Sequence, residues 1–557
     1  MDIANDGAAR VRADTHEVLT QPTPLEPYDA WATDTALGTA VEREGGGWAG
    51  AELAAYGRAA GGPLFAAGFL AENHRPELQT HDRYGHRVDR VEYHPAYHEL
   101  MRSAIEAGIP SLPWTVARPG AHVARAALEY LHDQADAGTG CPLTMTFAAV
   151  PALRVQPDVS ADWLRRAGAR VYDPADRPWF DKAGVTIGMA MTEKQGGSDL
   201  RGNTTRALAV AGRGPGARYE LTGHKGFCSA PMCDGFLMLA QAAGGLSCFL
   251  LPRWRGDGRR NGLRLQRLKN KLGNRSNASA EIELHDAEAW MIGPEGRGVR
   301  TIIEMVMMTR FDCIVGSASL MRQAVAQALH HCSQRKVSGR TLGTHPLMQN
   351  VLADLALESE AALRLALRVA RRLDEAPADA RARDFVRVAT AVGKFWVCKR
   401  APALAAEAAE CLGGGGYVEE SILPRLYREA PVNSTWEGSG NVQCVDVLRA
   451  LAREPAALEA FLVELAPAAA LDRRLAAHVA RLQDDLAQAD EREHRARELV
   501  GRMAVALQAA LLLEAGHGAL ADAFCATRLA TGAMVYGELP TGLDCATIVE
   551  RARPQPG

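Results

Sequence analysis

The chain has 557 residues, of which 47% are hydrophobic and 23% charged, and its formal net charge at neutral pH is −3. This composition is typical of a globular protein with several domains and a large buried core. The near balance of charge excludes a general electrostatic attraction of the whole chain to nucleic acid or to anionic membranes.

The eleven cysteines are scattered from Cys141 to Cys545 and include no C-x-x-C pair. An odd number of dispersed thiols indicates reduced cysteines in the cytoplasm rather than a disulfide framework. Cys228 and Cys233 are near each other, but no His/Cys pair follows at the spacing of a zinc site. The polar N-terminus lacks the apolar run of a secretory signal, and no stretch reaches the roughly 18 apolar residues of a membrane span.

Residues 1–47 are expected to form a loop-like N-terminal arm, since they contain three prolines and few periodic apolar positions. The alternative for this arm is simple terminal disorder. Residues 48–184 are expected to form a helical domain, because alanine and leucine recur at helical spacing, for example in 51–60 and 121–137.

Two histidines in this helical domain, His94 and His98, are four residues apart, a spacing that suits a metal on one helix face. Pro95 between them fits only the first turn of a helix, and no third ligand is obvious. A packing or capping role is therefore favoured over metal binding.

Residues 185–290 change character and are expected to form a small β domain, either a sandwich or a barrel. Gly, Asp and Pro separate its short β-type runs, which are 219–222, 236–240, 247–251 and 280–284. Long helical patterns then return in residues 291–450, and residues 451–557 predict an additional helical region rich in alanine and leucine.

The segment from Met189 to Asp199 reads Met-Ala-Met-Thr-Glu-Lys-Gln-Gly-Gly-Ser-Asp and follows a predicted strand at 184–188. Glycines let a backbone approach a flat ligand closely, and hydroxyls and free backbone N–H groups supply donors for a polar ring edge or a phosphate. Taken alone, this pattern is equally typical of a turn-rich strand exit.

Three further segments occur downstream in a characteristic order. They read Leu-Thr-Gly-His-Lys-Gly-Phe-Cys-Ser at 221–229, Arg-Lys-Val-Ser-Gly at 335–339 and Trp-Glu-Gly-Ser-Gly-Asn at 436–441. Together these segments resemble the acyl-CoA dehydrogenase flavoprotein family. Two more, at 271–279 and 308–312, resemble its adaptive-response, AidB-like branch, so that the resemblance spans nearly the whole chain. It implies a mainly α fold with a small central β domain, followed by an extra helical region.

The resemblance also implies an FAD-binding oxidoreductase that acts on CH–CH bonds of acyl thioesters. Such a reaction needs a carboxylate that removes the α-proton while a hydride passes to the flavin. Glu437, between Trp436 and Gly438, matches the family's base, and the alternative for it is a surface glutamate in a turn.

Arg310 matches an arginine that faces the site in the family. A guanidinium near Glu437 would lower the pKa of that carboxyl, whereas desolvation would raise it, and the sequence does not decide which effect is larger. The alternative for Arg310 is a structural ion pair with Asp312 or Glu304.

The resemblance further assigns residues to the cofactor, FAD. The matching positions are Met189, Met191, Thr192, Ser198, Phe227, Cys228, Ser229, Trp436, Gly438, Ser439 and Asn441. Arg335 matches an arginine that pairs with the cofactor pyrophosphate of a neighbouring subunit, where its planar fork suits phosphate. A homo-oligomer is therefore expected, with a tetramer as the preferred state, and no metal or membrane is expected to take part.

The branch resemblance implies an alternative function, an alkylation-stress flavoprotein that binds duplex DNA and protects or repairs it. Residues 451–557 contain 11 arginines and no lysine against 15 acidic residues, a balance that is untypical of a DNA-binding module. Multiples of seven residues separate Arg474, Arg481, Arg495 and Arg502. On one continuous helix these four would form a stripe able to contact phosphates, or else a solvated face paired with nearby carboxylates.

Overall fold

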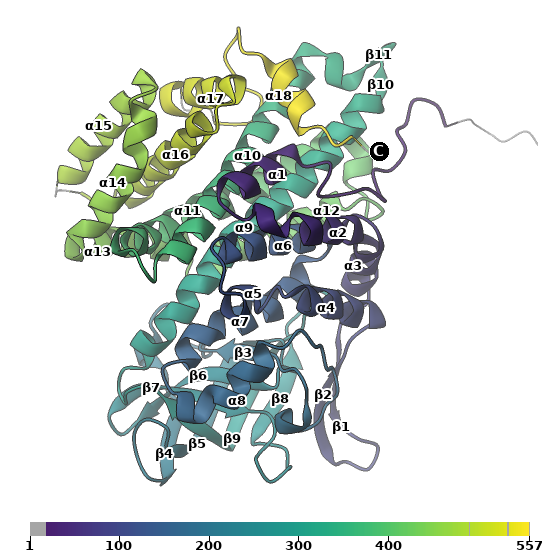
Figure 1. Cartoon of the computed structure of the whole chain (residues 1–557). Helices are drawn as coiled ribbons and strands as arrows, with labels where there is room; N and C mark the ends of the chain where they lie inside the picture. Colours follow the sequence, from purple (N-terminus) through teal and green to yellow (C-terminus); the bar gives the residue numbers. More distant parts are fainter. Residues whose placement is uncertain (1–17, 489–490, 532–533, 556–557) are drawn as a thin grey trace, which may run out of the picture.

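The computed structural model describes residues 18–488, 491–531 and 534–555. A β domain occupies one end of the molecule, layers of helices lie over it, and the last helices form a separate group on one side (Figure 1). This arrangement confirms the predicted fold class of helices around a small central β domain.

The N-terminal part is helical with one hairpin. Its helices are α1 (Thr35–Arg43), α2 (Gly50–Ala60), α3 (Pro63–Asn73), α4 (Pro95–Ala107), α5 (Leu112–Thr115), α6 (Ala121–Ala135), α7 (Ala137–Leu153) and α8 (Pro157–Ala167). Strands β1 (Glu77–His81) and β2 (Arg87–Glu92) pair as an antiparallel hairpin that the sequence did not predict.

The predicted arm differs from the structure at α1, and its first 17 residues lie outside the described part of the chain. Asp34 caps α1 by accepting a hydrogen bond from the Leu37 N–H. Leu37, Ala40 and Val41 are buried on one face. A capped helix with apolar residues at i, i+3 and i+4 is stable here because that face packs on the core.

The two histidines of the helical domain have structural roles. The side chain of His94 caps α4 by accepting a hydrogen bond from the Ala96 N–H, with Pro95 in the first turn. His98 Nδ1 lies 2.8 Å from the Tyr172 hydroxyl. The capping role is confirmed, and the described residues contain no group of three or more ligands placed to hold a metal.

Seven strands form the β domain. They are β3 (Ile187–Ala190), β4 (Arg206–Ala211), β5 (Arg218–Ser229), β6 (Gly235–Ala242), β7 (Gly245–Pro252), β8 (Leu263–Leu268) and β9 (Ser279–Ile292). The strand order is β3-β6-β4-β5-β9-β7, and β7 also pairs with β6, so that the sheet closes into a small barrel. β3 lies outside this ring and pairs with β6 in parallel. Its carboxyl end leads into the Met191–Asp199 segment.

The C-terminal part contains long helices. They are α9 (Gly298–Gln334), α10 (Pro346–Glu375), α11 (Ala380–Cys411), α12 (Leu423–Thr435), α13 (Gly440–Arg453), α14 (Pro455–Ala469), α15 (Arg473–Ala487), α16 (Ala496–Glu514), α17 (Gly518–Phe524) and α18 (Cys545–Ala552). Strands β10 (Lys336–Val337) and β11 (Arg340–Thr341) form a two-residue hairpin after α9. Within the described ranges, no helix is both long enough and apolar enough to cross a membrane.

Helix α9 connects the barrel to the helical layers. It has 37 residues, or about 55 Å at 1.5 Å per residue, and it contacts β7 near one end and α10 and α11 along its length (Figure 1). Apolar residues occur all round it because it is enclosed by other elements. Its Thr309 and Arg310 lie on the turns that face the loop between α12 and α13.

Candidate active site

The loop that joins α12 to α13 carries Glu437 in an uncommon backbone conformation. Glu437 has φ of 56° and Gly438 has φ of 93°, so both lie in the left-handed region. Such a conformation costs a non-glycine residue on the order of 1–3 kcal/mol and persists only where the surroundings hold it.

Two side chains hold this loop through its carbonyl groups. Lys394 Nζ, from the buried face of α11, donates to the carbonyls of Asn433 (3.0 Å), Trp436 (2.9 Å) and Gly438 (2.8 Å). Gln443 Nε2, from α13, donates to the carbonyls of Glu437 (3.1 Å) and Gly438 (2.9 Å). The cation and the amide therefore fix the backbone and leave the carboxylate of Glu437 free of an ion pair with Lys394.

Arg310 also binds the backbone of the loop. Its Nε donates to the Glu437 carbonyl at 3.0 Å, and its Nη1 pairs with Asp446 of α13 at 2.9 Å. The ion pair expected as an alternative, with Asp312 or Glu304, is not formed with Asp312, which instead binds Arg125 in the core. The guanidinium is thus shared between a counter-charge and a carbonyl.

The carboxyl group of Glu437 accepts a hydrogen bond from the Thr309 hydroxyl at 2.7 Å, through Oε2. Burial raises the pKa of Glu437, and the opposing effects of Thr309, Lys394 and Arg310 are smaller. Desolvation therefore has a larger effect on the pKa of Glu437 than the charge of Arg310 has, a balance that the sequence left undecided. A carboxylate with a raised pKa is a better proton acceptor than an ordinary one.

The strand side of the site is built from the carboxyl ends of β3 and β5. The Gly226 N–H donates to the Thr192 carbonyl at 2.8 Å, which brings Met191 and Thr192 beside Phe227 and Ser229. Phe227 is 54% exposed, and Lys269 Nζ lies 4.5 Å from its ring centroid. Met191, Thr192 and Ser229 are partly exposed.

The glutamate of the same segment, Glu193, is structural. It is buried, binds Lys225 Nζ at 3.0 Å, and accepts from the hydroxyls of Thr204 and Thr205. These contacts hold the pKa of Glu193 well below its usual range, mainly through hydrogen bonds and the charge of Lys225 acting against burial. Its role is to anchor the segment, while Ser198 lies on the exposed part.

Cys141, near the start of α7, is near residues from both sides of the site, the Glu437 loop and the carboxyl end of β5. Burial raises the pKa of its thiol to about 12, and both a hydrogen bond from Ser229 and the charge of Glu437 act on it. Cys141 is therefore near Lys271, Ser229 and Glu437. Cys228 differs, since its side chain is fully buried in the barrel core, on the opposite face of β5 from Phe227 and Ser229. A contact of Cys228 with a cofactor is limited to its backbone.

Arg335 is remote from this site in the same chain. It follows Arg310 by 25 residues along α9, which corresponds to about 37 Å at 1.5 Å per residue. Its Nη1 donates to the Thr20 carbonyl (3.2 Å) and hydroxyl (2.6 Å) of the N-terminal arm. Ser439 and Asn441, in contrast, are exposed next to Glu437.

Sequence reasoning missed three side chains of the site: Thr309, Lys394 and Gln443. Each contacts the Glu437 loop from another helix, and no local pattern identifies such contacts. The sequence did hold one indication of Lys394. Apart from Arg387, it is the only charged residue in the apolar run 385–398. A charged residue at a core position of a helix needs a partner.

The four arginines predicted as a stripe do not lie on one helix. α15 ends at Ala487 and α16 begins at Ala496, so the seven-residue spacing loses its geometric meaning. Three of the four are paired with carboxylates: Arg474 with Asp472 and Asp522, Arg495 with Asp485 and Glu498, and Arg502 with Asp485. Arg481 is exposed. The alternative of a paired, solvated face is therefore the better description of this surface.

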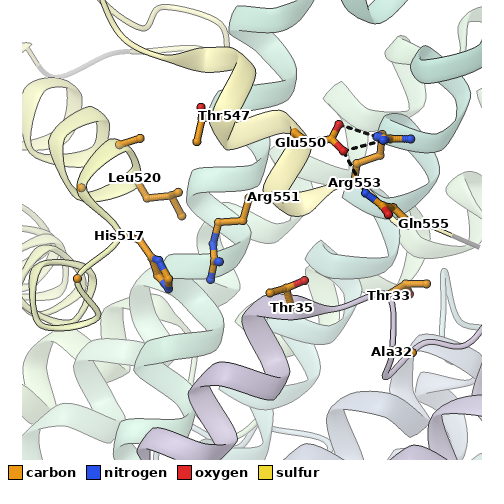
Figure 2. A pocket seen from close by; sticks show the side chains of 13 residues that line it. Ala32, Thr33, Thr35, His517, Leu520, Thr547, Glu550, Arg551, Arg553 and Gln555 are labelled. Atoms are coloured by element: carbon orange, nitrogen blue, oxygen red, sulfur yellow. Dashed lines mark hydrogen bonds and ion pairs between the residues drawn. The ribbon is translucent and has the colours of Figure 1, made fainter.

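A separate hollow of about 710 Å³ lies between the N-terminal arm, the start of α17 and helix α18 (Figure 2). His517 and Arg551 point into the same space, and Glu550 binds Arg553 and Gln555 at its rim. Arg551 is also paired with Glu360, at 3.1 Å. None of the residues of the Glu437 site lines this hollow.

Comparison with known families identifies three matching regions. Residues 20–174 match the adaptive response protein AidB N-terminal domain, 188–287 the acyl-CoA dehydrogenase middle domain and 296–452 its C-terminal domain. AidB of Escherichia coli strain K12 is 45% identical over 93% of this chain and 95% of its own length. Acyl-CoA dehydrogenase family member 11 of Caenorhabditis elegans is 32% identical over 74% of this chain and 68% of its own length.

A solved structure of Caenorhabditis elegans ACDH-11 with C11-CoA superposes with a TM-score of 0.83 at 27% identity, covering 99% of this chain and 95% of that one. The cofactor of the family is FAD, and the donor set seen here suits it. Exposed Phe227 offers a ring face, and the hydroxyls of Thr192 and Ser229 offer hydrogen bonds to a polar ring edge. The chain belongs to the acyl-CoA dehydrogenase family, in its AidB-like branch, and is an FAD-dependent oxidoreductase of that family.

Proposed function

We propose that the Glu437 site dehydrogenates acyl-CoA thioesters between the α- and β-carbons, with Glu437 as the base. The carrying observation is a carboxyl of raised pKa on a loop with positive φ, bound through Oε2 to Thr309 and held at its backbone carbonyls by neighbouring side chains. The C11-CoA complex of ACDH-11 supports an acyl-CoA as the substrate class.

In this proposal Glu437 takes the α-proton, and the electron pair of that bond forms the new carbon–carbon double bond. Bound FAD supplies the acceptor for the hydride that leaves the β-carbon. Thr309 occupies Oε2 of Glu437, which leaves Oε1 as the oxygen that receives the proton. Arg310, Lys394 and Gln443 position the loop through its carbonyls.

Other residues are proposed to hold FAD. Met189, Met191, Thr192, Phe227 and Ser229 would line the flavin ring, together with the backbones of Cys228 and Gly438 and the indole of Trp436. Ser198, Ser439 and Asn441 would bind the more polar parts of the cofactor. These side chains include hydroxyls and an amide, which suit phosphate and ribose oxygens.

The position of Arg335 supports an oligomer. At about 37 Å along α9 from Arg310, it can meet a pyrophosphate only if the cofactor belongs to a neighbouring subunit. We expect a homotetramer that works in the cytoplasm, where eleven free thiols stay reduced.

The direct test is anaerobic mixing of the FAD-loaded protein with straight-chain acyl-CoA thioesters of increasing length, followed by the flavin absorbance. Bleaching of the oxidised band is expected with at least one chain length. A 2,2-dimethylacyl-CoA of matched length, which has no α-proton, serves as the control and should not bleach it. Bleaching that is equal with both compounds would contradict proton removal from the α-carbon.

Duplex DNA is a second candidate partner, and the arginines first considered for it do not favour it. Three of those four side chains are already paired with carboxylates, so their charge is locally neutralised. We expect any binding of DNA to be weak, salt-sensitive and independent of sequence. A gel shift at several salt concentrations tests this expectation.

A further inference from the structure

Lys271, in the loop between β8 and β9, directs its ammonium group at three acceptors. Its Nζ lies 2.8 Å from the Asn277 carbonyl, 3.2 Å from the Ser279 hydroxyl and 3.3 Å from Asn274 Oδ1. An ammonium group has three N–H donors and no acceptor. Every one of these hydrogen bonds must therefore run from the lysine outward.

Ser279, at the start of β9, is the second group in this chain of hydrogen bonds. Its hydroxyl is buried and lies 3.0 Å from the Ser229 hydroxyl. In the part of the chain that the structure describes, Lys271 and Ser229 are the two hydrogen-bond neighbours of Ser279 Oγ. Because Ser279 accepts from Lys271, its own proton is best satisfied by donation to Ser229, and a hydroxyl polarised by a cation is a stronger donor.

Ser229 then directs its own proton away from Ser279, toward Cys141 and the open side of β5. Its oxygen accepts from Ser279, so the Ser229 O–H is left to donate away from the barrel, on the partly exposed face of β5. Three groups therefore form a one-way chain of donors, from Lys271 in the β8–β9 loop through Ser279 to Ser229, which is near Cys141.

We propose that Lys271, acting through Ser279, orients the Ser229 hydroxyl as a hydrogen-bond donor to the polar edge of the flavin and makes reduction of the bound FAD more favourable. This inference rests on the proposed contact of Ser229 with the flavin. Lys271 and Ser279 are positioning residues, because neither touches the substrate or the cofactor itself.

The physical reason is the charge that develops on the ring. A flavin that accepts a hydride gains negative charge, and a donor backed by the partly buried cation of Lys271 stabilises that charge more than a freely rotating hydroxyl does. Burial lowers the pKa of Lys271, and the smaller opposing effects come from Cys141 and then from the carboxyl groups of Glu429, Glu72 and Asp136.

The test measures the two-electron midpoint potential of bound FAD, without substrate, in variants of the relay. Ser279→Ala cuts the relay and leaves Lys271 in place, Ser279→Thr keeps a hydroxyl, and Lys271→Met removes the cation. We expect Ser279→Ala and Lys271→Met each to disfavour reduction about tenfold, which corresponds to about 30 mV for a two-electron couple. Ser279→Thr should restore most of the loss.

A matched control is Ser247→Ala, which removes another buried hydroxyl from the same barrel, one that bonds the Gly245 carbonyl at 2.9 Å. This control should leave the potential unchanged. If Lys271→Met does not fold, the pair Ser279→Ala and Ser279→Thr carries the test alone. Equal potentials in wild type and Ser279→Ala would overturn the relay.

Ser229→Ala separates this inference from the proposed function. If Ser229→Ala leaves both the flavin spectrum and the potential unchanged, the placement of Ser229 at the flavin has failed, and the relay fails with it. If Ser229→Ala shifts the potential but Ser279→Ala does not, the placement stands and only the relay is overturned. In the Ser229→Ala background, Ser279→Ala should have no further effect.

Discussion

Charged side chains are held in opposite ways in the Glu437 loop and in the helical region after residue 450. Around the loop, Lys394 and Arg310 donate hydrogen bonds to backbone carbonyls. The carboxyl of Glu437 accepts its hydrogen bond from a neutral group, the Thr309 hydroxyl. In the later helices the arginines bind carboxylates, as Arg474 does with Asp472 and Arg502 with Asp485.

The difference has a chemical consequence. A carboxylate paired with a cation has a low pKa and is a poor base, whereas burial raises the pKa of Glu437 by more than Thr309, Lys394 and Arg310 lower it. The paired arginines of the later helices are neutralised and serve packing. Arg368 of α10 is held in the same way, since it binds Glu44 after α1 and two carboxylates of the later helices, Glu464 of α14 and Glu514 of α16.

The largest expected effect is on Glu437 itself. Glu437→Gln keeps the shape and removes the base, so FAD should stay bound while its reduction by acyl-CoA slows by at least about a hundredfold. Anaerobic stopped-flow absorbance measures the rate. A variant that bleaches FAD as fast as the wild type would show that Glu437 is not the base.

Breaking the ion network should affect stability and leave the site intact. Arg368→Met removes the cation shared by three carboxylates, each of which keeps one other arginine, and we expect a loss of about 1.5–3 kcal/mol in the free energy of unfolding. Arg371→Met is the control, because Arg371 is 40% exposed and its pairs with Glu375 at 2.9 Å and Glu44 at 3.7 Å should together contribute less than about 1 kcal/mol. Chemical denaturation of both variants, compared with wild type, decides the matter, and equal losses would contradict the account.

The pH dependence sharpens the comparison further. The rate of flavin reduction should increase with pH as the carboxyl of Glu437 loses its proton. Because the pKa of Glu437 is raised, the midpoint of this rising limb of the pH profile should lie above the ordinary carboxyl pKa of 4.5. Thr309→Val removes a hydrogen bond to the ionised form and should move this limb to higher pH. A limb that stays in place or moves down would argue against the Thr309 contact.

The raised pKa of Glu437 also makes the stability of the fold depend on pH. The rate of flavin reduction should rise with pH, whereas the contribution of this carboxyl to stability should fall. A carboxyl with a raised folded pKa stabilises the fold while protonated, and this contribution is lost as the pH rises through the folded pKa. Glu437→Gln should therefore be more stable than wild type above that pKa, with the difference vanishing below pH 4.5. Thermal unfolding across this pH range, measured without substrate, should show the two stability curves merging below pH 4.5, and a difference that does not change with pH would contradict the shift.

The smallest effect is expected for the four arginines of the later helices. Changing Arg474, Arg481, Arg495 and Arg502 to Gln should leave both the affinity for duplex DNA and its salt dependence close to wild type. Four lost phosphate contacts would instead reduce the salt slope by about 3 to 4. A reduction of that size would restore this surface as a DNA contact.

The sequence predicted most of the fold because long elements have strong periodic patterns. The long helical patterns expected in 291–450 appear as α9 to α13, and the four β runs lie in β5, β6, β7 and β9. The short helix α1 and the β1–β2 hairpin were missed, since a nine-residue helix and two polar strands give weak signals.

Long-range contacts limited what the sequence could predict of the site. The resemblance led to Glu437 and Arg310, but the hydrogen bond from Thr309 spans 128 positions and the one from Lys394 to Gly438 spans 44. The arginine stripe failed for a related reason. Seven-residue spacing describes one face only on a continuous helix, and nothing in that spacing reveals that α15 ends at Ala487.

The most direct measurement is a structure of the oligomer with FAD bound. The account predicts the flavin ring between Ser229 and Glu437, with the Thr309 hydroxyl still on Oε2 and Arg335 of a neighbouring subunit at the pyrophosphate. An FAD molecule bound away from Glu437, or a cofactor whose pyrophosphate is held entirely within one chain while Arg335 keeps its contact with Thr20, would contradict it.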